Sequence, residues 1–142
     1  MNLKMLIGIL MVVIVDYGMG NLKSIQNMFF KLGVTAEITN DIKKIKNADR
    51  LILPGVGSFD YGMSMIKASG LLNSIDTVVN DRGRPLLGIC LGAQMLGKSS
   101  EEGSSEGLGW INMKAKKLRS CMINRVPNMG WRNIDIKKNV PI

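Results

Sequence analysis

Strand-like segments alternate with helix-like segments, in which apolar residues recur at helical spacing, through the first hundred residues of the chain. A strand covered on both faces is apolar throughout, so each apolar run predicts a buried β-strand of a parallel sheet. Such runs lie at residues 11–15 and 86–89, and at residues 50–53 after Arg50. Residues 34–38, which include Thr35 and Glu37, also predict a strand. Helical spacing is found at residues 22–32, 71–79 and 91–96. The alternation predicts an α/β fold with a doubly wound, mostly parallel, flavodoxin-like sheet and helices on both faces.

The pattern changes after Gly103, where glycine and serine are followed by rough period-two alternation at residues 110–118 and 134–138. These two stretches predict antiparallel strands at one side of the sheet. The sequence stops at Ile142 without a closing helix, so we expect residues 11–142 to be a partial domain and residues 1–10 an extension before it. Such a domain should expose apolar surface and an open sheet edge.

Composition restricts the possible functions. A chain of 142 residues with 46% hydrophobic and 21% charged residues fits one folded domain and excludes disorder. Two cysteines and no histidine cannot build a disulfide framework or a zinc site, so we expect no metal, no cofactor and a cytoplasmic location. The longest apolar run, at residues 5–15, has 11 residues and is shorter than the ~18 needed to span a bilayer. No membrane partner is therefore expected.

The net charge of +8 allows two interpretations. Many of the cations come late in the chain: Lys114, Lys116, Lys117, Arg119, Arg125, Arg132, Lys137 and Lys138. A basic nucleic-acid-binding face is one interpretation, and steep salt-dependent DNA affinity would identify it. With only 5% aromatic residues to stack on bases, the sequence favours a solvated lysine-rich surface and no nucleic-acid partner.

The strongest chemical signal is the sequence Gly88-Ile89-Cys90-Leu91-Gly92, which joins an apolar strand to a helical segment. This is the pattern of a nucleophile elbow, with cysteine as the nucleophile. Its turn is so sharp that the flanking positions have no room for a Cβ atom, which explains the glycines. A buried structural cysteine is the alternative, but glycine on both sides at a strand-to-helix junction argues against it.

A second signal, Pro54-Gly55-Val56-Gly57-Ser58, follows the third predicted strand. Glycine-rich turns at the carboxyl ends of strands leave backbone N–H groups free to point into the crevice. Such donors could stabilise the oxyanion formed when Cys90 attacks a carbonyl group, and the Leu91 N–H would be a second donor. The two signals together predict an active site.

These motifs resemble the class I glutamine amidotransferases, and most closely the branch that provides the glutaminase subunit of imidazole glycerol phosphate synthase. The matching stretches are VDYGMGNLKSI (15–25), LILPGVGSFDYGM (51–63), GICLGAQMLGKSSEEGSSEGLGW (88–110) and VPNMGW (126–131). They occur in the order and spacing of that family over nearly the whole chain.

The resemblance implies hydrolysis of glutamine through a Cys90 thioester in histidine biosynthesis. Ammonia would pass to a (β/α)8 cyclase subunit, the partner in a heterodimer. By motif match, Cys90 is the nucleophile and Val56 and Leu91 supply the oxyanion donors. Gly57, Gln94 and Glu102 would hold the glutamine, and Asn21, Asn128 and Trp131 would face the cyclase.

Two departures from the family change what we expect. Asn128 stands where the family has histidine, which affects the expected partner interface. The F-H-P-E segment that completes a Cys-His-Glu triad has no counterpart, and the chain contains no histidine. Without a base, leaving-group protonation and deacylation receive no help, so we expect no useful glutaminase turnover from this chain alone. We still expect Cys90 to react with a glutamine-mimicking electrophile.

Two alternatives stay open. The first is a paralogous amidotransferase that supplies ammonia for amidation of a surface sugar, of the lipopolysaccharide type. The second is a catalytically dead remnant or docking domain that binds a cyclase without catalysing a reaction. Neighbouring genes would separate the first from the histidine pathway. A cyclase pull-down with a null ammonia assay would support the second.

Overall fold

Four parallel strands form the centre of the molecule, in the spatial order β2-β1-β3-β4. The computed structural model describes residues 10–120 and the single positions 126, 130, 133, 135 and 137. The strands are β1 (Val12–Val15), β2 (Ala36–Thr39), β3 (Arg50–Leu53) and β4 (Leu86–Gly88). Each overlaps a strand predicted from the sequence, and β3 matches its predicted strand residue for residue.

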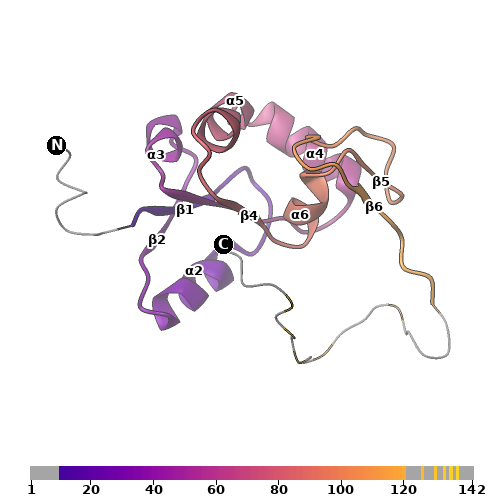
Figure 1. Cartoon of the computed structure of the whole chain (residues 1–142), viewed down its shortest axis with the longest axis horizontal. Coiled ribbons are helices and arrows are strands. Elements are labelled where there is room, and N and C mark those ends of the chain that lie inside the picture. The colour runs from indigo at the N-terminus through magenta and orange to yellow at the C-terminus, as the bar shows by residue number, and fades with distance from the viewer. Residues whose placement is uncertain are drawn as a thin grey trace.

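Helices cover both faces of this sheet, as the sequence predicted. α2 lies on one face, and α3, α4, α5 and α6 lie on the other (Figure 1). Their bounds are α2 (Leu22–Lys31), α3 (Ile42–Lys46), α4 (Phe59–Ala68), α5 (Leu72–Asp76) and α6 (Leu91–Met95). α5 continues directly into a π-helix, η1 (Thr77–Asp81). No helix in the described part of the chain is long and apolar enough to cross a membrane.

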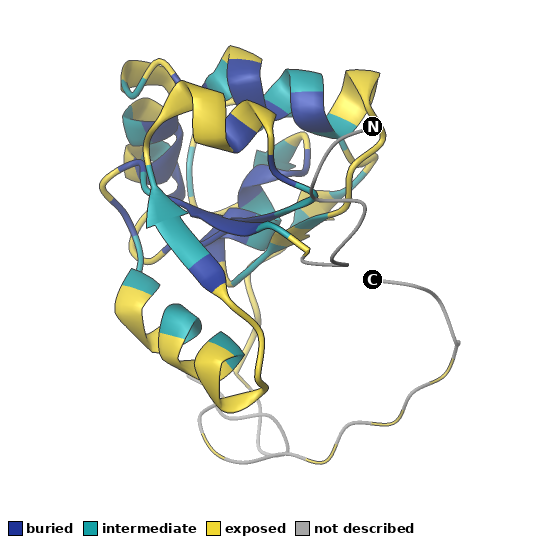
Figure 2. Cartoon of the chain, turned by 90° about the vertical axis from the view of Figure 1, so that its left-hand side faces the viewer, coloured by how far each residue is buried: buried dark blue, intermediate teal, exposed yellow. Residues whose placement is uncertain are grey.

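The strands divide their side chains between two cores because successive residues of a strand point to opposite faces. Val13, Val15 and Leu51 face the larger core, where they contact α3, α4, α5 and α6. That core includes the fully buried Ile45, Phe59, Met63, Ile66, Ile75 and Met95. Val12, Ile14 and Ile52 face the smaller core under α2. The central strands β1 and β3 are largely buried, whereas β2 and β4 are mostly half-buried. Figure 2 shows α2 largely exposed.

The face under α2 is only partly covered. A groove of about 180 Å³ opens beside α2 over β3 and β4, lined by Val12, Phe29, Arg50, Leu51, Ile52, Pro85, Leu86 and Leu87. Leu87 lies in β4, an edge strand of the sheet, and is 42% exposed. Among the described residues, the expectation of exposed apolar surface and an open sheet edge is confirmed.

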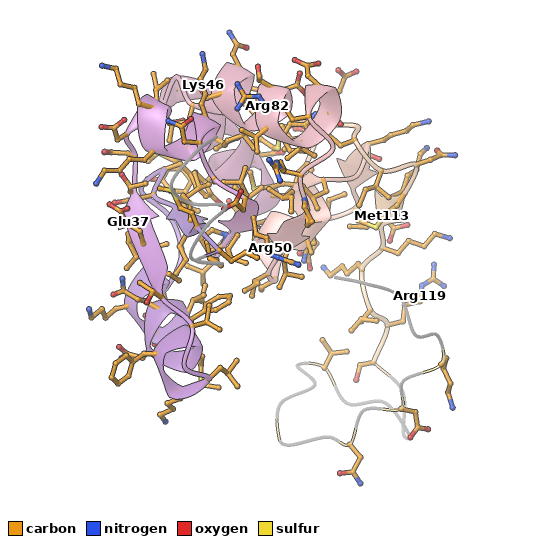
Figure 3. The ribbon with its side chains drawn as sticks, turned by 60° about the vertical axis from the view of Figure 1, so that its left-hand side comes forward. Glu37, Lys46, Arg50, Arg82, Met113 and Arg119 are labelled. Carbon is orange, nitrogen blue, oxygen red and sulfur yellow. The ribbon has the colours of Figure 1, made fainter. Side chains whose placement is uncertain are left out.

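Two helices were not predicted from the sequence. α3 has Asp41 as its N-cap, whose carboxylate accepts the Lys43 and Lys44 N–H groups. Arg82, at the end of η1, donates from Nη1 to the Lys46 carbonyl at 2.5 Å and so joins η1 to the end of α3 (Figure 3). α4 buries Phe59, Met63 and Ile66, which have helical spacing. Both signals were available in the sequence.

The prediction of an antiparallel strand is wrong for the first of the two stretches after Gly103, residues 110–118. β6 (Lys114–Ala115) pairs in parallel with β5 (Ser99–Ser100). The chain between them makes no hairpin, because its N–H groups bind the carbonyl groups around the end of α6. Leu108 donates to Met95, Gly109 to Gly97 and Ile111 to Leu96, at 2.8–3.0 Å. Most of the second predicted stretch, 134–138, lies outside the described residues.

Candidate active site

Cys90 lies at the bend between β4 and α6 in a strained backbone conformation, with φ +56° and ψ −118°. Among the described residues it is the only one other than glycine with positive φ. Such a conformation costs of order 1–3 kcal/mol and persists only where the surroundings enforce it. The predicted strand-to-helix elbow is therefore present, and its cysteine is exposed to solvent.

The flanking glycines allow the bend to pack against β3. A Cβ atom on Gly88 would lie 2.6 Å from the Ala93 Cα, and one on Gly92 would collide with the carbonyl oxygen of Leu53. The same Leu53 oxygen accepts the Ile89 N–H at 3.0 Å. The elbow is thus held by backbone contacts that a side chain would disrupt.

The glycine-rich turn after β3 lies directly against this elbow. A Cβ atom on Gly55 would be 2.7 Å from the Gly92 nitrogen and 2.9 Å from the Leu91 Cβ. Gly57 has φ +104°, and Val56 is 60% exposed. Within residues 10–120 neither the Val56 nor the Leu91 N–H donates a hydrogen bond to the protein. Leu91 opens α6, where the first N–H groups have no intrahelical acceptor.

Tyr17 hydrogen-bonds to the glycine-rich turn after β3, and the sequence analysis did not identify it. Its hydroxyl donates to the Pro54 carbonyl at 2.6 Å and lies 3.7 Å from the Met95 sulfur. Burial raises the pKa of Tyr17 to about 12, so the hydroxyl stays protonated and keeps donating. Its position in Asp16-Tyr17-Gly18, directly after a buried strand, was the available signal.

Gln94 and Glu102 differ in their surroundings. The Gln94 Oε1 is buried and has no hydrogen-bond partner among the described residues. A buried acceptor left unpaired is costly and calls for an explanation, such as a missing donor. Gln94 is one helical turn beyond Cys90, whose carbonyl accepts the Gln94 N–H at 3.2 Å. Glu102 is exposed in the loop after β5, where its N–H donates to the Ser100 hydroxyl at 3.1 Å.

The residues expected to face a partner are only partly described. Asn21 is exposed at the start of α2, and its side-chain oxygen accepts the Ser24 N–H at 3.3 Å as an N-cap. Asn128 and Trp131 lie outside the described residues. In the described part of the chain, no three His, Cys, Asp or Glu side chains gather in a way that could hold a metal ion.

Asp60, in the first turn of α4, binds the loop after Glu102. Its carboxylate accepts the Ser104 N–H at 2.9 Å, the Ser105 N–H at 2.8 Å and the Ser104 hydroxyl at 3.2 Å. These bonds, the backbone ones first, lower the pKa of Asp60 from 3.8 to about 2. The sequence analysis missed this residue too.

The lowered pKa predicts an acid-sensitive contact. The folded pKa of Asp60 lies below its ordinary value, so its stabilisation is full above pH about 4 and is lost as the pH falls toward about 2. We expect the difference in free energy of unfolding between the unmodified chain and Asp60→Asn to follow this course. Urea unfolding at a series of pH values measures it. A difference that is constant with pH would contradict the assignment.

Together, the parallel sheet, the strained cysteine and the adjoining glycine turn define an α/β protein with a nucleophile elbow. The model of the protein family described as "Glutamine amidotransferase class-I" matches residues 13–137 of this chain. The chain therefore belongs to the class I glutamine amidotransferase family.

Two named relatives agree with this assignment. The chain is 50% identical over 124 residues to "Imidazole glycerol phosphate synthase subunit HisH 2" of Methanococcus maripaludis, covering 87% of this chain and 61% of the relative. It is 42% identical over 132 residues to the protein of the same name from Pseudomonas aeruginosa, covering 93% and 65%. It thus spans about three fifths of the length of these relatives.

The fold is also similar to a solved structure described as "Crystal structure of glutamine amidotransferase". The TM-score is 0.59 at 22% sequence identity, over 73% of this chain and 55% of that chain. This similarity supports the fold.

Proposed function

We propose that this chain carries the nucleophile and the oxyanion donors of a glutaminase that serves imidazole glycerol phosphate synthase in histidine biosynthesis. The single observation that carries the proposal is the strained, exposed Cys90 at the elbow. Its sulfur attacks the side-chain amide carbon of glutamine and forms a thioester as ammonia leaves. The names of the two relatives support the histidine pathway over sugar amidation.

The free backbone donors beside Cys90 suit the charge that develops in this reaction. When the carbonyl carbon is attacked, its oxygen becomes negative, and the N–H groups of Val56 and Leu91 have no competing acceptor among the described residues. Each preorganised donor is typically worth about 3 kcal/mol of transition-state stabilisation. Gly57, Gln94 and Glu102 hold the glutamine, with the unpaired Gln94 oxygen available to a donor on the substrate.

The same chain supplies no imidazole. A class I mechanism needs a group that protonates the departing ammonia and later activates water, and no histidine is present among these 142 residues. We therefore infer that residues 11–142 form the part of the amidotransferase domain that carries the thiol, and that this chain by itself attacks glutamine without turning it over.

The partner in this proposal is a (β/α)8 cyclase that receives the ammonia. Asn21 supports the assignment of one contact, since it is exposed on the loop that follows β1. Asn128 and Trp131 are proposed to complete the interface. Co-purification with the cyclase tests this part of the proposal. If Cys90 lacked glutamine-dependent reactivity and the cyclase still bound, a non-catalytic docking domain would be the better description.

Covalent labelling tests the catalytic proposal. We expect a glutamine analogue bearing a reactive diazoketone to modify the chain once, at Cys90, with a rate that saturates and falls when glutamine is added. Peptide mass spectrometry locates the adduct. Cys90→Ala should abolish labelling, whereas Cys121→Ala, which removes the other cysteine, should leave it unchanged. Labelling that does not saturate, or that occurs at Cys121, would refute the proposal.

A further inference from the structure

We propose that Asp60 is a positioning residue that ties the loop carrying Glu102 to the turn carrying Gly57, and so assembles the two sides of the glutamine site. This inference rests on the proposed function, because it takes Glu102 and Gly57 to hold the substrate glutamine as proposed there. It concerns residues 101–106, named here the serine loop.

The serine loop is fixed at both ends by backbone contacts. The Glu101 N–H donates to the Ala115 carbonyl at 2.9 Å, and the Gly107 N–H donates to the Lys98 carbonyl at 2.8 Å. Between these two anchors, the Ser100 hydroxyl accepts the Glu102 N–H at 3.1 Å, and Asp60 is the one side chain distant in the sequence that hydrogen-bonds to the loop within the described part of the chain. The N–H groups of Ser104 and Ser105 therefore depend on a single carboxylate.

Close packing accompanies these hydrogen bonds. A Cβ atom on Gly103 would collide with the Asp60 carboxylate and would lie 3.2 Å from the Phe59 Cδ1. The loop backbone therefore lies directly on the first turn of α4, a fit that glycine at position 103 permits. The N–H and O–H donors of the loop favour the charged carboxylate, which lowers the pKa of Asp60.

The positions of the partners explain why this contact matters for substrate. Asp60 follows Gly57 by three residues, and Ser104 follows Glu102 by two. α4 itself lies against α6, since a Cβ atom on Gly62 would be 2.9 Å from the Leu91 Cδ2. The elbow, the glycine turn and the serine loop are therefore connected through the first turns of α4.

Asp60→Asn is the informative change. It keeps the size of the side chain but removes the negative charge that strengthens the bonds to the Ser104 and Ser105 N–H groups. It also replaces Oδ2, which accepts the Ser104 N–H at 3.1 Å and the Ser104 hydroxyl at 3.2 Å, with an NH2 group that donates. We expect the half-saturating concentration of the glutamine-mimicking diazoketone to rise by about tenfold or more, since small misplacements of binding groups are costly. The rate of Cys90 alkylation by iodoacetamide, which needs no glutamine site, should stay within about twofold.

Two further variants make the result decisive. Asp81→Asn, at an exposed position in η1, is the matched control and should behave as the unmodified chain does. Ser105→Pro removes the 2.8 Å N–H bond without changing α4, and should reproduce the effect of Asp60→Asn even if that variant folds poorly.

The outcomes separate this inference from the proposed function. If the unmodified chain shows no saturable labelling, the proposed function fails. If it saturates and both Asp60→Asn and Ser105→Pro saturate at the same concentration as the unmodified chain, only the positioning role is overturned. An equal change in the diazoketone and iodoacetamide reactions would also overturn it, because a general loosening of the elbow would then be the cause.

Discussion

The purified 142-residue chain is expected to hydrolyse glutamine on the order of 10⁶-fold more slowly than an amidotransferase that has a base beside its nucleophile. Deleting the base from a serine hydrolase slows its turnover by about this factor. A cysteine sulfur is intrinsically a strong nucleophile, so the initial attack suffers least. Departure of ammonia and hydrolysis of the thioester receive no proton transfer, because no histidine is available. Glutamate formation, followed with a coupled dehydrogenase, measures the turnover.

Cys90→Ala is the control for this measurement, since it removes the nucleophile and reports the background hydrolysis. The unmodified chain should form at most about one glutamate per chain above that background. Repeated turnovers that depend on Cys90 would show that another group replaces the histidine, and would contradict the inference that this chain lacks a working base.

Gly92→Ala is expected to destabilise the fold by about 3 kcal/mol or more, at the upper end of the range for overpacking. The new methyl group would collide with the carbonyl oxygen of Leu53, a backbone atom in the central sheet that cannot move aside as a side chain can. The collision would separate α6 from β3 and displace the elbow. Urea unfolding followed by circular dichroism measures the loss.

Gly70→Ala is the matched control for this substitution. Gly70 has φ +72°, but no atom lies within 4 Å of the position of an added Cβ. Only the conformational cost of about 1–2 kcal/mol should appear there. Gly92 lies in α6 without a positive φ, so equal destabilisation by the two substitutions would show that the structure relaxes around the new methyl group and that close packing against β3 does not require glycine there.

Much of the fold could be predicted because its signals are local. The runs that became β1 and β4 are apolar without interruption, and so is β3 after Arg50. Leu22, Ile25 and Phe29 have the helical spacing that places them on the face of α2 toward the sheet. The parallel pairing of β5 and β6 could not be read in the same way. It depends on carbonyl groups at the end of α6 binding N–H groups ten or more residues later, and backbone bonds leave no pattern in side chains.

The same distinction between local and long-range signals applies to the residues of the candidate site. Cys90 and the Gly55–Gly57 turn are marked by glycines whose close approaches are local to the motif or lie between neighbouring strands. Tyr17 and Asp60 act over 37 and 44 residues, through one phenol and one carboxylate that have no distinctive sequence context. The roles assigned to Val56, Gly57, Gln94 and Glu102 stay predictions, as do those of Asn21, Asn128 and Trp131.

The most direct test of the central claim is an NMR measurement on an adduct of Cys90. An aldehyde analogue of glutamine should add to the Cys90 sulfur and place its new oxygen where the oxyanion would form. We predict that the amide signals of Val56 and Leu91 then shift most, while those of Gly33 and Gly70 stay in place and Cys90→Ala shows no change. An adduct on Cys90 that leaves the Val56 and Leu91 amides unmoved would contradict the account.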